Sequence, residues 1–229
     1  MDSVPQFDLG VVCGRFGHEQ IGHKSLFDWG LKLCRRLYII VGSAQERGTL
    51  RNPFSVETRI DVIKATYPGI NEPRLVVSGL NDMTNELDVN EEWGKYLKSH
   101  IEDKMHKFAN LMIYGNDEFR SKWFAGEDLV NTAEMVIPRS AIPVSGTQVR
   151  GLLTIDAESE WQKCTPELVH FMYQRLRAEL MEVSEYRQIY DIVRRGKVMD
   201  LDSFMKAYKQ FEEEDRNKKL AELQKLTIK

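Results

Sequence analysis

Apolar residues gather in short continuous runs along the first 140 positions of the chain. The runs at 9–13, 37–41, 75–77, 111–114 and 135–137 are built mainly from Val, Ile, Leu, Met and Tyr. Strands that are apolar throughout, rather than at alternate positions, are typical of a parallel sheet covered on both faces. The pattern predicts five strands of such a sheet.

Segments with helical spacing separate these runs. Apolar residues recur through 24–34, and 91–108 has the pattern of another helix. Between them, Ser55 is a suitable N-cap for a helix that runs towards Tyr67, although Thr58 stands where a capping box has Glu. This alternation predicts an α/β fold, a Rossmann-like doubly wound parallel sheet, whose ligands bind beyond the carboxyl ends of the strands.

The pattern changes to helix alone from about Pro166. We therefore expect an α/β domain at 1–165 and a C-terminal helical extension at 166–229. Within 212–219, acidic residues stand four positions before basic ones, the favourable order for ion pairs on a solvated helix. Deleting the chain from about Tyr186 is expected to spare the functional site.

Composition narrows the class of protein. The chain has 229 residues, 42% of them hydrophobic and 29% charged, with a net charge of −3. This balance argues against a nucleic-acid partner. No apolar run reaches the roughly 20 residues that a membrane span needs, and the N-terminus lacks an apolar signal region. Three widely spaced cysteines make no disulfide framework, so we expect reduced thiols and a cytoplasmic protein.

Candidate chemistry begins directly after the first predicted strand. There the sequence GRFGHEQIGH at 14–23 opens into a helix. A glycine-bearing loop that meets a helix N-terminus offers free N–H groups and a positive dipole, which bind phosphate. Arg15 and His23 add charge and hydrogen-bond donors to this loop.

Two further segments at predicted strand ends have the same character. SGTQVR at 145–150 has Ser145 as N-cap of a second helix, and GSAQ at 42–45 is followed by LRNPFS at 50–55. An acidic chain that concentrates cations at one sheet edge is suited to a polyphosphate. The cations expected there are Arg15, His23, Arg51, Arg59 and Arg150.

These motifs carry a family resemblance. The first resembles the GRFxPxHxGH signature of the nucleotidyltransferase α/β (HxGH) superfamily, and SGTQVR resembles its ISxTxxR signature. Together with GSAQ, LRNPFS, NEEW at 90–93 and YGN at 114–116, the sequence is similar to the archaeal-type nicotinamide mononucleotide (NMN) adenylyltransferases over about 9–180. The resemblance implies transfer of AMP from ATP to NMN by direct in-line attack, which gives NAD and pyrophosphate.

The resemblance also implies roles for individual residues. It assigns His23, Arg15, Arg51 and Arg150 to catalysis at the reacting phosphates. For NMN it implies Asn90, Trp93 and Asn116, with either Asp82 or Asp88 reading the carboxamide. The residues it implies for ATP binding are Gly14, Arg15, Phe16, Gln20, Gly22, His23, Gly42, Ser43, Arg51, Ser145, Thr147 and Arg150.

The first motif departs from the signature at two positions. Gln20 stands where the family has its first histidine, and His18 stands where it has proline. Gln20 can donate a hydrogen bond but carries no charge. Losing one donor to a developing charge can cost on the order of 10²-fold in rate. His18 is a candidate to replace part of that function if the loop bends.

The resemblance implies Mg²⁺ carried by ATP rather than held in a protein cage, and the lack of a dense cluster of metal ligands in the sequence agrees with this. Expected partners are ATP, NMN, NAD and pyrophosphate, and relatives suggest a homo-oligomer. Two alternatives stay open at this point: an adenylyltransferase for another phosphate acceptor such as pantetheine phosphate, and a nucleotide-binding protein with weak catalysis. The choice between NMN and nicotinic acid mononucleotide is also open.

Overall fold

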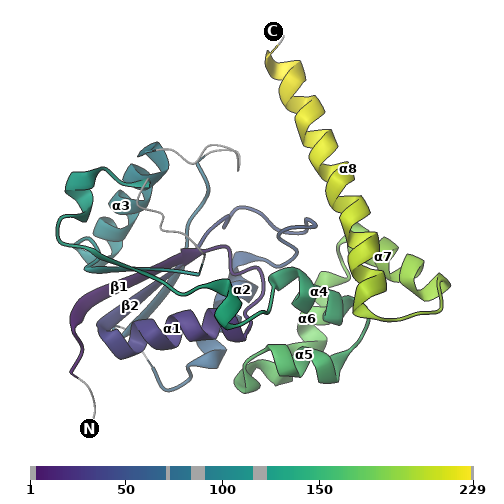
Figure 1. The fold of residues 1–229 in the computed structure, drawn as a ribbon, viewed down its shortest axis with the longest axis horizontal. Helices are drawn as coiled ribbons and strands as arrows, with labels where there is room; N and C mark the ends of the chain where they lie inside the picture. The colour runs from purple at the N-terminus through teal and green to yellow at the C-terminus, as the bar shows by residue number, and fades with distance from the viewer. Residues whose placement is uncertain (1–3, 71–72, 84–90, 116–122, 228–229) are drawn as a thin grey trace.

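The computed structural model describes residues 4–70, 73–83, 91–115 and 123–227. Five strands form one parallel sheet in the order β3-β2-β1-β4-β5, with β1 at its centre (Figure 1). The strands are β1 (Phe7–Gly14), β2 (Cys34–Val41), β3 (Leu75–Gly79), β4 (Leu111–Tyr114) and β5 (Ala133–Val136). The predicted doubly wound α/β fold is confirmed.

Helices cover both faces of the sheet because the strands are apolar on both sides. Helices α1 (Ile21–Leu33) and α2 (Val56–Thr66) pack on one face, where Val12 and Ile39 point. Helix α3 (Glu91–Met105) packs on the other face against Val11 and Ile40. Adjacent residues of one strand therefore enter different cores, which explains the continuous apolar runs in the sequence.

The structure moves two predicted boundaries. Helix α1 begins at Ile21 rather than near residue 24, because the side chain of Gln20 accepts a hydrogen bond from the N–H of Gly22 and caps the helix. Strand β5 covers Ala133–Val136 rather than 135–137, and its partly exposed residues pair only with β4. An edge strand with few buried residues leaves a weak apolar pattern in the sequence.

A group of helices follows β5. It consists of α4 (Gly146–Thr154), α5 (Glu158–Cys164), α6 (Tyr173–Leu180), α7 (Ser184–Arg195) and α8 (Leu201–Thr227), with short 3₁₀ turns at Gly126–Leu129, Arg139–Ala141 and Glu167–Met172. These helices share one apolar core with Phe54 and Val62 of the α/β part. Phe204 and Tyr208, in the first turns of α8, are buried in that core. The rest of α8 projects from the body (Figure 1), and its acidic residues 212–214 are exposed, as predicted.

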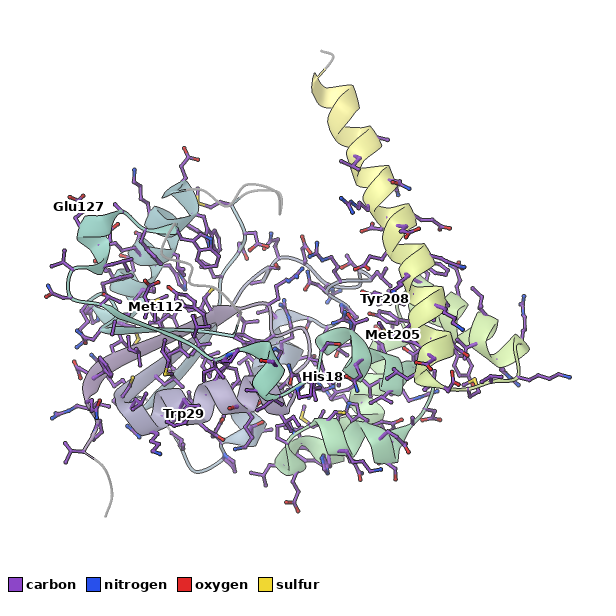
Figure 2. All side chains as sticks on the ribbon, viewed as in Figure 1. His18, Trp29, Met112, Glu127, Met205 and Tyr208 are labelled. Carbon is purple, nitrogen blue, oxygen red and sulfur yellow. The ribbon has the colours of Figure 1, made fainter. Side chains whose placement is uncertain are left out.

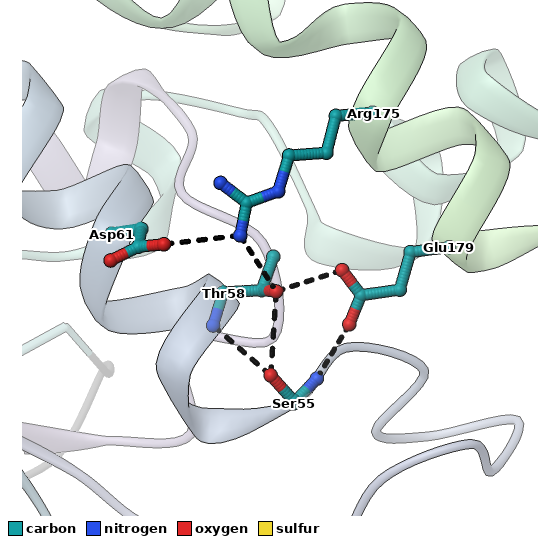
Figure 3. Close-up of polar contacts among 5 residues, drawn as sticks. All are labelled: Ser55, Thr58, Asp61, Arg175 and Glu179. Carbon is teal, nitrogen blue, oxygen red and sulfur yellow. Dashed lines mark hydrogen bonds and ion pairs between the residues drawn. The ribbon is translucent and has the colours of Figure 1, made fainter.

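A polar contact fixes α6 to the start of α2 (Figure 3). The hydroxyl of Ser55 caps α2 by accepting from the N–H of Thr58 at 3.1 Å. The carboxylate of Glu179 accepts from the N–H of Ser55 at 2.9 Å and from the hydroxyl of Thr58 at 2.8 Å. In a capping box, a Glu three residues after the N-cap accepts from that same N–H. Here a residue 124 positions away along the chain does so.

We predict that Glu179→Ala lowers the free energy of unfolding by about 1.5–3 kcal/mol, the usual range for hydrogen bonds to a charged group. The substitution also removes a negative charge from the N-terminus of α2. Chemical denaturation monitored by circular dichroism measures the effect. Glu182→Ala, which changes an exposed residue just beyond the same helix, is the control and should differ little from wild type. Equal stability of the two variants would contradict this account.

Candidate active site

The candidate site lies at the carboxyl edge of the sheet, where the loops after β1 and β2 meet. Arg59 of α2 is buried and ties these loops together. Its Nη1 donates to the carbonyls of Arg15 at 2.9 Å and Gly42 at 2.8 Å, and its Nη2 donates to the carbonyl of Ser43 at 3.0 Å. Its Nε donates to the carbonyl of Ser55 at 3.3 Å. Arg59 was expected to face a polyphosphate; instead, main-chain oxygens engage its N–H groups.

The loop after β2 has a second support. Ser43 has a φ of 49°, in the left-handed region that non-glycine residues seldom adopt. Asp82, beyond β3, accepts from the hydroxyl of Ser43 at 2.5 Å and from its N–H at 3.3 Å. Both carboxylate oxygens of Asp82 are thus engaged with Ser43, so this residue supports the loop. Asp88, the other candidate for the carboxamide, lies outside the described residues.

The loop after β1 holds its side chains at different depths. Phe16, with a φ of 43°, turns its ring into the core, where it meets the edge of His23 at 5.1 Å between ring centroids and Phe27 at 5.2 Å. Gly14 makes room for this ring, because a Cβ there would lie 2.9 Å from it. Phe16 therefore supports the first turn of α1, which carries the predicted catalytic residue His23.

Gln20 occupies the N-terminus of α1. Its Oε1 accepts from the N–H of Gly22 at 2.5 Å, and a Cβ on Gly22 would approach that oxygen to 2.7 Å. Gly22 is required for this close approach. Gln20, which stands where the family signature has histidine, is thus the N-cap of α1, the helix that carries His23.

His18 has a structural position, not the phosphate-binding one considered from the sequence (Figure 2). Its ring is 3% exposed and lies edge-on to Phe54 and Trp161. The indole N–H of Trp161 donates to Nε2 at 3.1 Å, and Nδ1 donates to the carbonyl of Glu19 at 2.7 Å. This pattern uses both nitrogens of a neutral ring. Burial, together with the charge of Arg150, lowers the pKa of His18 to about 3, even though the hydrogen bond to Glu19 opposes the change.

Arg150 of α4 is a second buried cation of the site, with 8% of its surface exposed. Nε donates to the hydroxyl of Tyr186 at 2.7 Å, and Nη2 donates to the hydroxyls of Thr147 at 3.2 Å and Tyr208 at 3.4 Å. None of the ion pairs found among the described residues includes Arg150. Its charge is therefore oriented by neutral hydroxyls without being cancelled.

Of the other predicted cations, Arg15 lies near Arg150, and Arg51 lies near Arg15. Burial, which removes water from the charged form, lowers the pKa of Arg15, and the positive charge of Arg150 lowers it further. Burial also lowers the pKa of Arg51, and the positive charge of Arg15 adds to that effect. Ser145 caps α4 by accepting from the N–H of Gln148 at 3.1 Å, as predicted, so a helix N-terminus faces the same region. Mutual repulsion among three guanidinium groups, relieved by an anion, suits this edge to a polyphosphate.

The predicted NMN residues are only partly described. Asn90 and Asn116 lie outside the described residues. Trp93, in the first turn of α3, is partly exposed and packs against Tyr96 and the edge of Trp123, with ring centroids 5.7 and 6.3 Å apart. Because α3 connects two parallel strands, its first turn lies at the carboxyl edge of the sheet. The position of Trp93 is compatible with its predicted role.

Neither a membrane helix nor a built metal cage emerges from the described part of the chain. No helix there is long and apolar enough to cross a bilayer. The described residues contain no group of three or more His, Cys, Asp or Glu that could hold a metal ion.

A doubly wound parallel sheet with cationic loops and a capped helix at its carboxyl edge defines a nucleotide-binding α/β protein. The family model for cytidylyltransferase-like proteins matches residues 11–225, and the chain belongs to this family. The predicted membership of the nucleotidyltransferase superfamily is confirmed. The match extends into α8, well beyond the residues that the sequence motifs covered.

Individual relatives point in the same direction. The chain is 27% identical to the nicotinamide-nucleotide adenylyltransferase of Aeropyrum pernix over 156 residues, which is 67% of this chain and 83% of that protein. It is 26% identical to the nicotinamide/nicotinic acid mononucleotide adenylyltransferase of Acinetobacter baylyi over 157 residues, which is 68% and 82% of the two chains.

The fold is also similar to a solved structure. This is a bifunctional NMN adenylyltransferase/ADP ribose pyrophosphatase from Francisella tularensis, complexed with AMP and a Mn ion. The TM-score is 0.58 at 18% sequence identity, and the match covers 82% of this chain. The chain spans about half, 55%, of that larger protein.

We predict that His18 makes stability sensitive to acid. Its pKa falls from 6.5 in the unfolded chain to about 3 in the fold. The unfolded chain therefore binds more protons between these values. The stability that neutral His18 contributes is complete above pH 6.5 and is lost as pH falls, by about 1.4 kcal/mol per unit. Burial raises the pKa of the neighbouring carboxyl of Glu19 from 4.5 to about 8. Between these values Glu19 therefore makes the protein less stable as pH rises, the opposite of the His18 effect.

The His18 contribution is isolated by subtracting two pH–stability curves, one of wild type and one of His18→Gln, measured by urea unfolding. The difference should shrink as pH falls below 6.5. His106→Asn, which changes an exposed histidine with a φ of 59°, is the matched control and should leave the curve unchanged. A difference that is constant with pH would contradict the assignment.

Proposed function

We propose that the protein is an NMN adenylyltransferase, which transfers AMP from ATP to NMN and releases pyrophosphate. The observation that carries the proposal is the group of cations formed by Arg15, Arg51 and Arg150, held beside the N-terminus of α4 in a chain of this family. The names of the archaeal and bacterial relatives support NMN as the acceptor.

The charge of the site favours a ligand with several phosphates. A buried guanidinium without a carboxylate partner is costly in the absence of an anion. Nη1 of Arg150 has no hydrogen-bond acceptor within the described ranges. It lies 3.2 Å from the place where a Cβ on Gly146 would stand and 3.7 Å from the corresponding place on Gly17. The cation thus lies between the N-terminus of α4 and the loop after β1, where a phosphate chain would meet Arg15 and Arg150.

The proposed reaction needs alignment and charge more than covalent catalysis. An oxygen of the NMN phosphate attacks the α-phosphorus of ATP, and the bond from that phosphorus to the bridging oxygen of pyrophosphate breaks. Arg15, Arg51 and Arg150 would offset the charge that grows on the leaving group. His23, oriented by the ring of Phe16, would donate a hydrogen bond to the transferring phosphate.

Two parts of the proposal depend on residues around the phosphate site. Trp93 would stack on the nicotinamide ring of NMN. Mg²⁺ would bind to the triphosphate of ATP rather than to a protein cage, since Asp82 is engaged with Ser43 and Glu46 with Asn52. Its contribution when bound would be to neutralise phosphate charge.

The direct test is an assay of purified protein with ATP, Mg²⁺ and NMN, in which NAD and pyrophosphate are measured together. Nicotinic acid mononucleotide and pantetheine phosphate are run in parallel as acceptors. We expect equal amounts of NAD and pyrophosphate with NMN. Pyrophosphate release with pantetheine phosphate but not with NMN would indicate an adenylyltransferase for another acceptor. ATP binding without turnover would indicate a nucleotide-binding protein with weak catalysis.

We predict that His23→Ala lowers kcat on the order of 10²-fold, because it removes a hydrogen bond made to charge that develops in the transition state. The melting temperature should change little, since His23 is half-buried at the start of α1 rather than part of the core. Steady-state kinetics and thermal unfolding are measured together. Lys24→Ala is the control: Lys24 follows His23 on the same helix and pairs with Asp28, at 2.6 Å. Near-normal turnover of His23→Ala would overturn the assigned role.

A further inference from the structure

Helix α7 places a hydroxyl group directly behind the candidate phosphate site. Tyr186 is fully buried in the core that the C-terminal helices share with α2 and α4. Its hydroxyl accepts from Nε of Arg150 at 2.7 Å and donates to the carbonyl of Leu50 at 2.7 Å. A phenol has one proton, and the carbonyl of Leu50 takes it, so the oxygen faces Arg150 as an acceptor.

The same hydroxyl connects two segments of the site. Leu50 precedes Arg51 in a turn closed by main-chain hydrogen bonds from Gly48 to Pro53 and from Thr49 to Asn52. Helix α4 carries Arg150. One buried oxygen therefore fixes the guanidinium of Arg150 relative to the turn that carries Arg51.

Tight packing holds this arrangement from the far side. A Cβ on Gly151 would lie 2.5 Å from the ring of Phe204 and 2.8 Å from Leu201, so α8 approaches α4 only because glycine stands there. This brings Tyr208 of α8 to Arg150, with its hydroxyl 3.4 Å from Nη2. The rings of Tyr186 and Tyr208 lie 6.4 Å apart.

We propose that Tyr186 is a positioning residue for phosphate binding: its hydroxyl orients Arg150 so that Nη1 lies between the N-terminus of α4 and the loop after β1. The inference rests on the proposed role of Arg150 in binding the phosphates. A carboxylate at the same position would also orient Arg150, but it would cancel the charge that the phosphate needs. A phenol orients the guanidinium and leaves its charge intact.

The test compares Tyr186→Phe with Tyr173→Phe. Tyr173 is buried in the same core, and its hydroxyl donates to Asp156 at 3.0 Å, away from Arg150. Binding of inorganic tripolyphosphate, measured by calorimetry, needs no acceptor substrate. We expect Tyr186→Phe to weaken this binding about tenfold, as for a misdirected charged hydrogen bond, and Tyr173→Phe to bind as wild type does. In turnover, Tyr186→Phe should lower kcat/KM for ATP and leave KM for NMN unchanged.

A double-mutant cycle separates positioning from a general packing effect. In the Arg150→Met background, Tyr186→Phe should change tripolyphosphate affinity by less than about twofold, because the residue it orients is gone. An equal loss in both backgrounds, an equal loss in Tyr173→Phe, or wild-type binding by Tyr186→Phe would each overturn the inference. If Tyr186→Phe does not fold, Tyr208→Phe replaces it and is expected to weaken binding in the same Arg150-dependent way.

The outcome is distinguishable from failure of the proposed function. Wild-type protein that binds tripolyphosphate but forms no NAD would remove the NMN adenylyltransferase proposal and leave the role of Tyr186 to be decided by the binding cycle. Wild-type protein that does not bind tripolyphosphate would overturn both.

Discussion

The buried guanidinium of Arg59 is the constraint on which the site depends. The loops after β1 and β2 leave neighbouring strands, and both expose main-chain carbonyls at the sheet edge. Arg59 gathers the carbonyls of Arg15, Gly42 and Ser43 around one planar fork of donors. A lysine offers three donors on a flexible stem and could not reproduce this fork. The clamp fixes the backbone of Arg15, so the side chain of Arg15 extends from a rigid base.

That rigidity allows like charges to be held together. Arg15, Arg51 and Arg150 each lie near another guanidinium. These like charges repel one another when no anion is present, so the side chains would move apart unless the fold held them. Arg150 is held by phenolic hydroxyls, and the Arg59 clamp fixes the backbone of Arg15, while Asp82 and Glu46 act on Arg15 from a distance. The neutral hydroxyls leave the charge of Arg150 uncancelled, so a polyphosphate would interact with it directly. This is preorganisation of charge, the main contribution expected from a protein in phosphoryl transfer.

The sequence predicts the sheet well because its signal is local. Five apolar runs, a glycine-bearing loop and the N-caps Ser55 and Ser145 all act within a few residues, and the structure confirms them. The sequence does not predict the contacts between residues that lie far apart along the chain. No local pattern shows that Glu179 would complete the cap of α2, that Arg59 would face carbonyls instead of phosphate, or that His18 would be buried against Trp161.

The C-terminal helices show why a motif boundary is a poor guide to a functional boundary. The sequence motifs end near residue 180, so deletion from Tyr186 was expected to spare the site. The structure contradicts that expectation, because the hydroxyls of Tyr186 and Tyr208 are hydrogen-bond partners of Arg150. Without Tyr186 and Tyr208, the hydroxyl of Thr147 would be the one remaining partner, of those described, for the buried guanidinium of Arg150. A charge so poorly satisfied would either turn towards solvent or destabilise α4. The orientation of Arg150 on α4 is therefore a property of both parts of the chain.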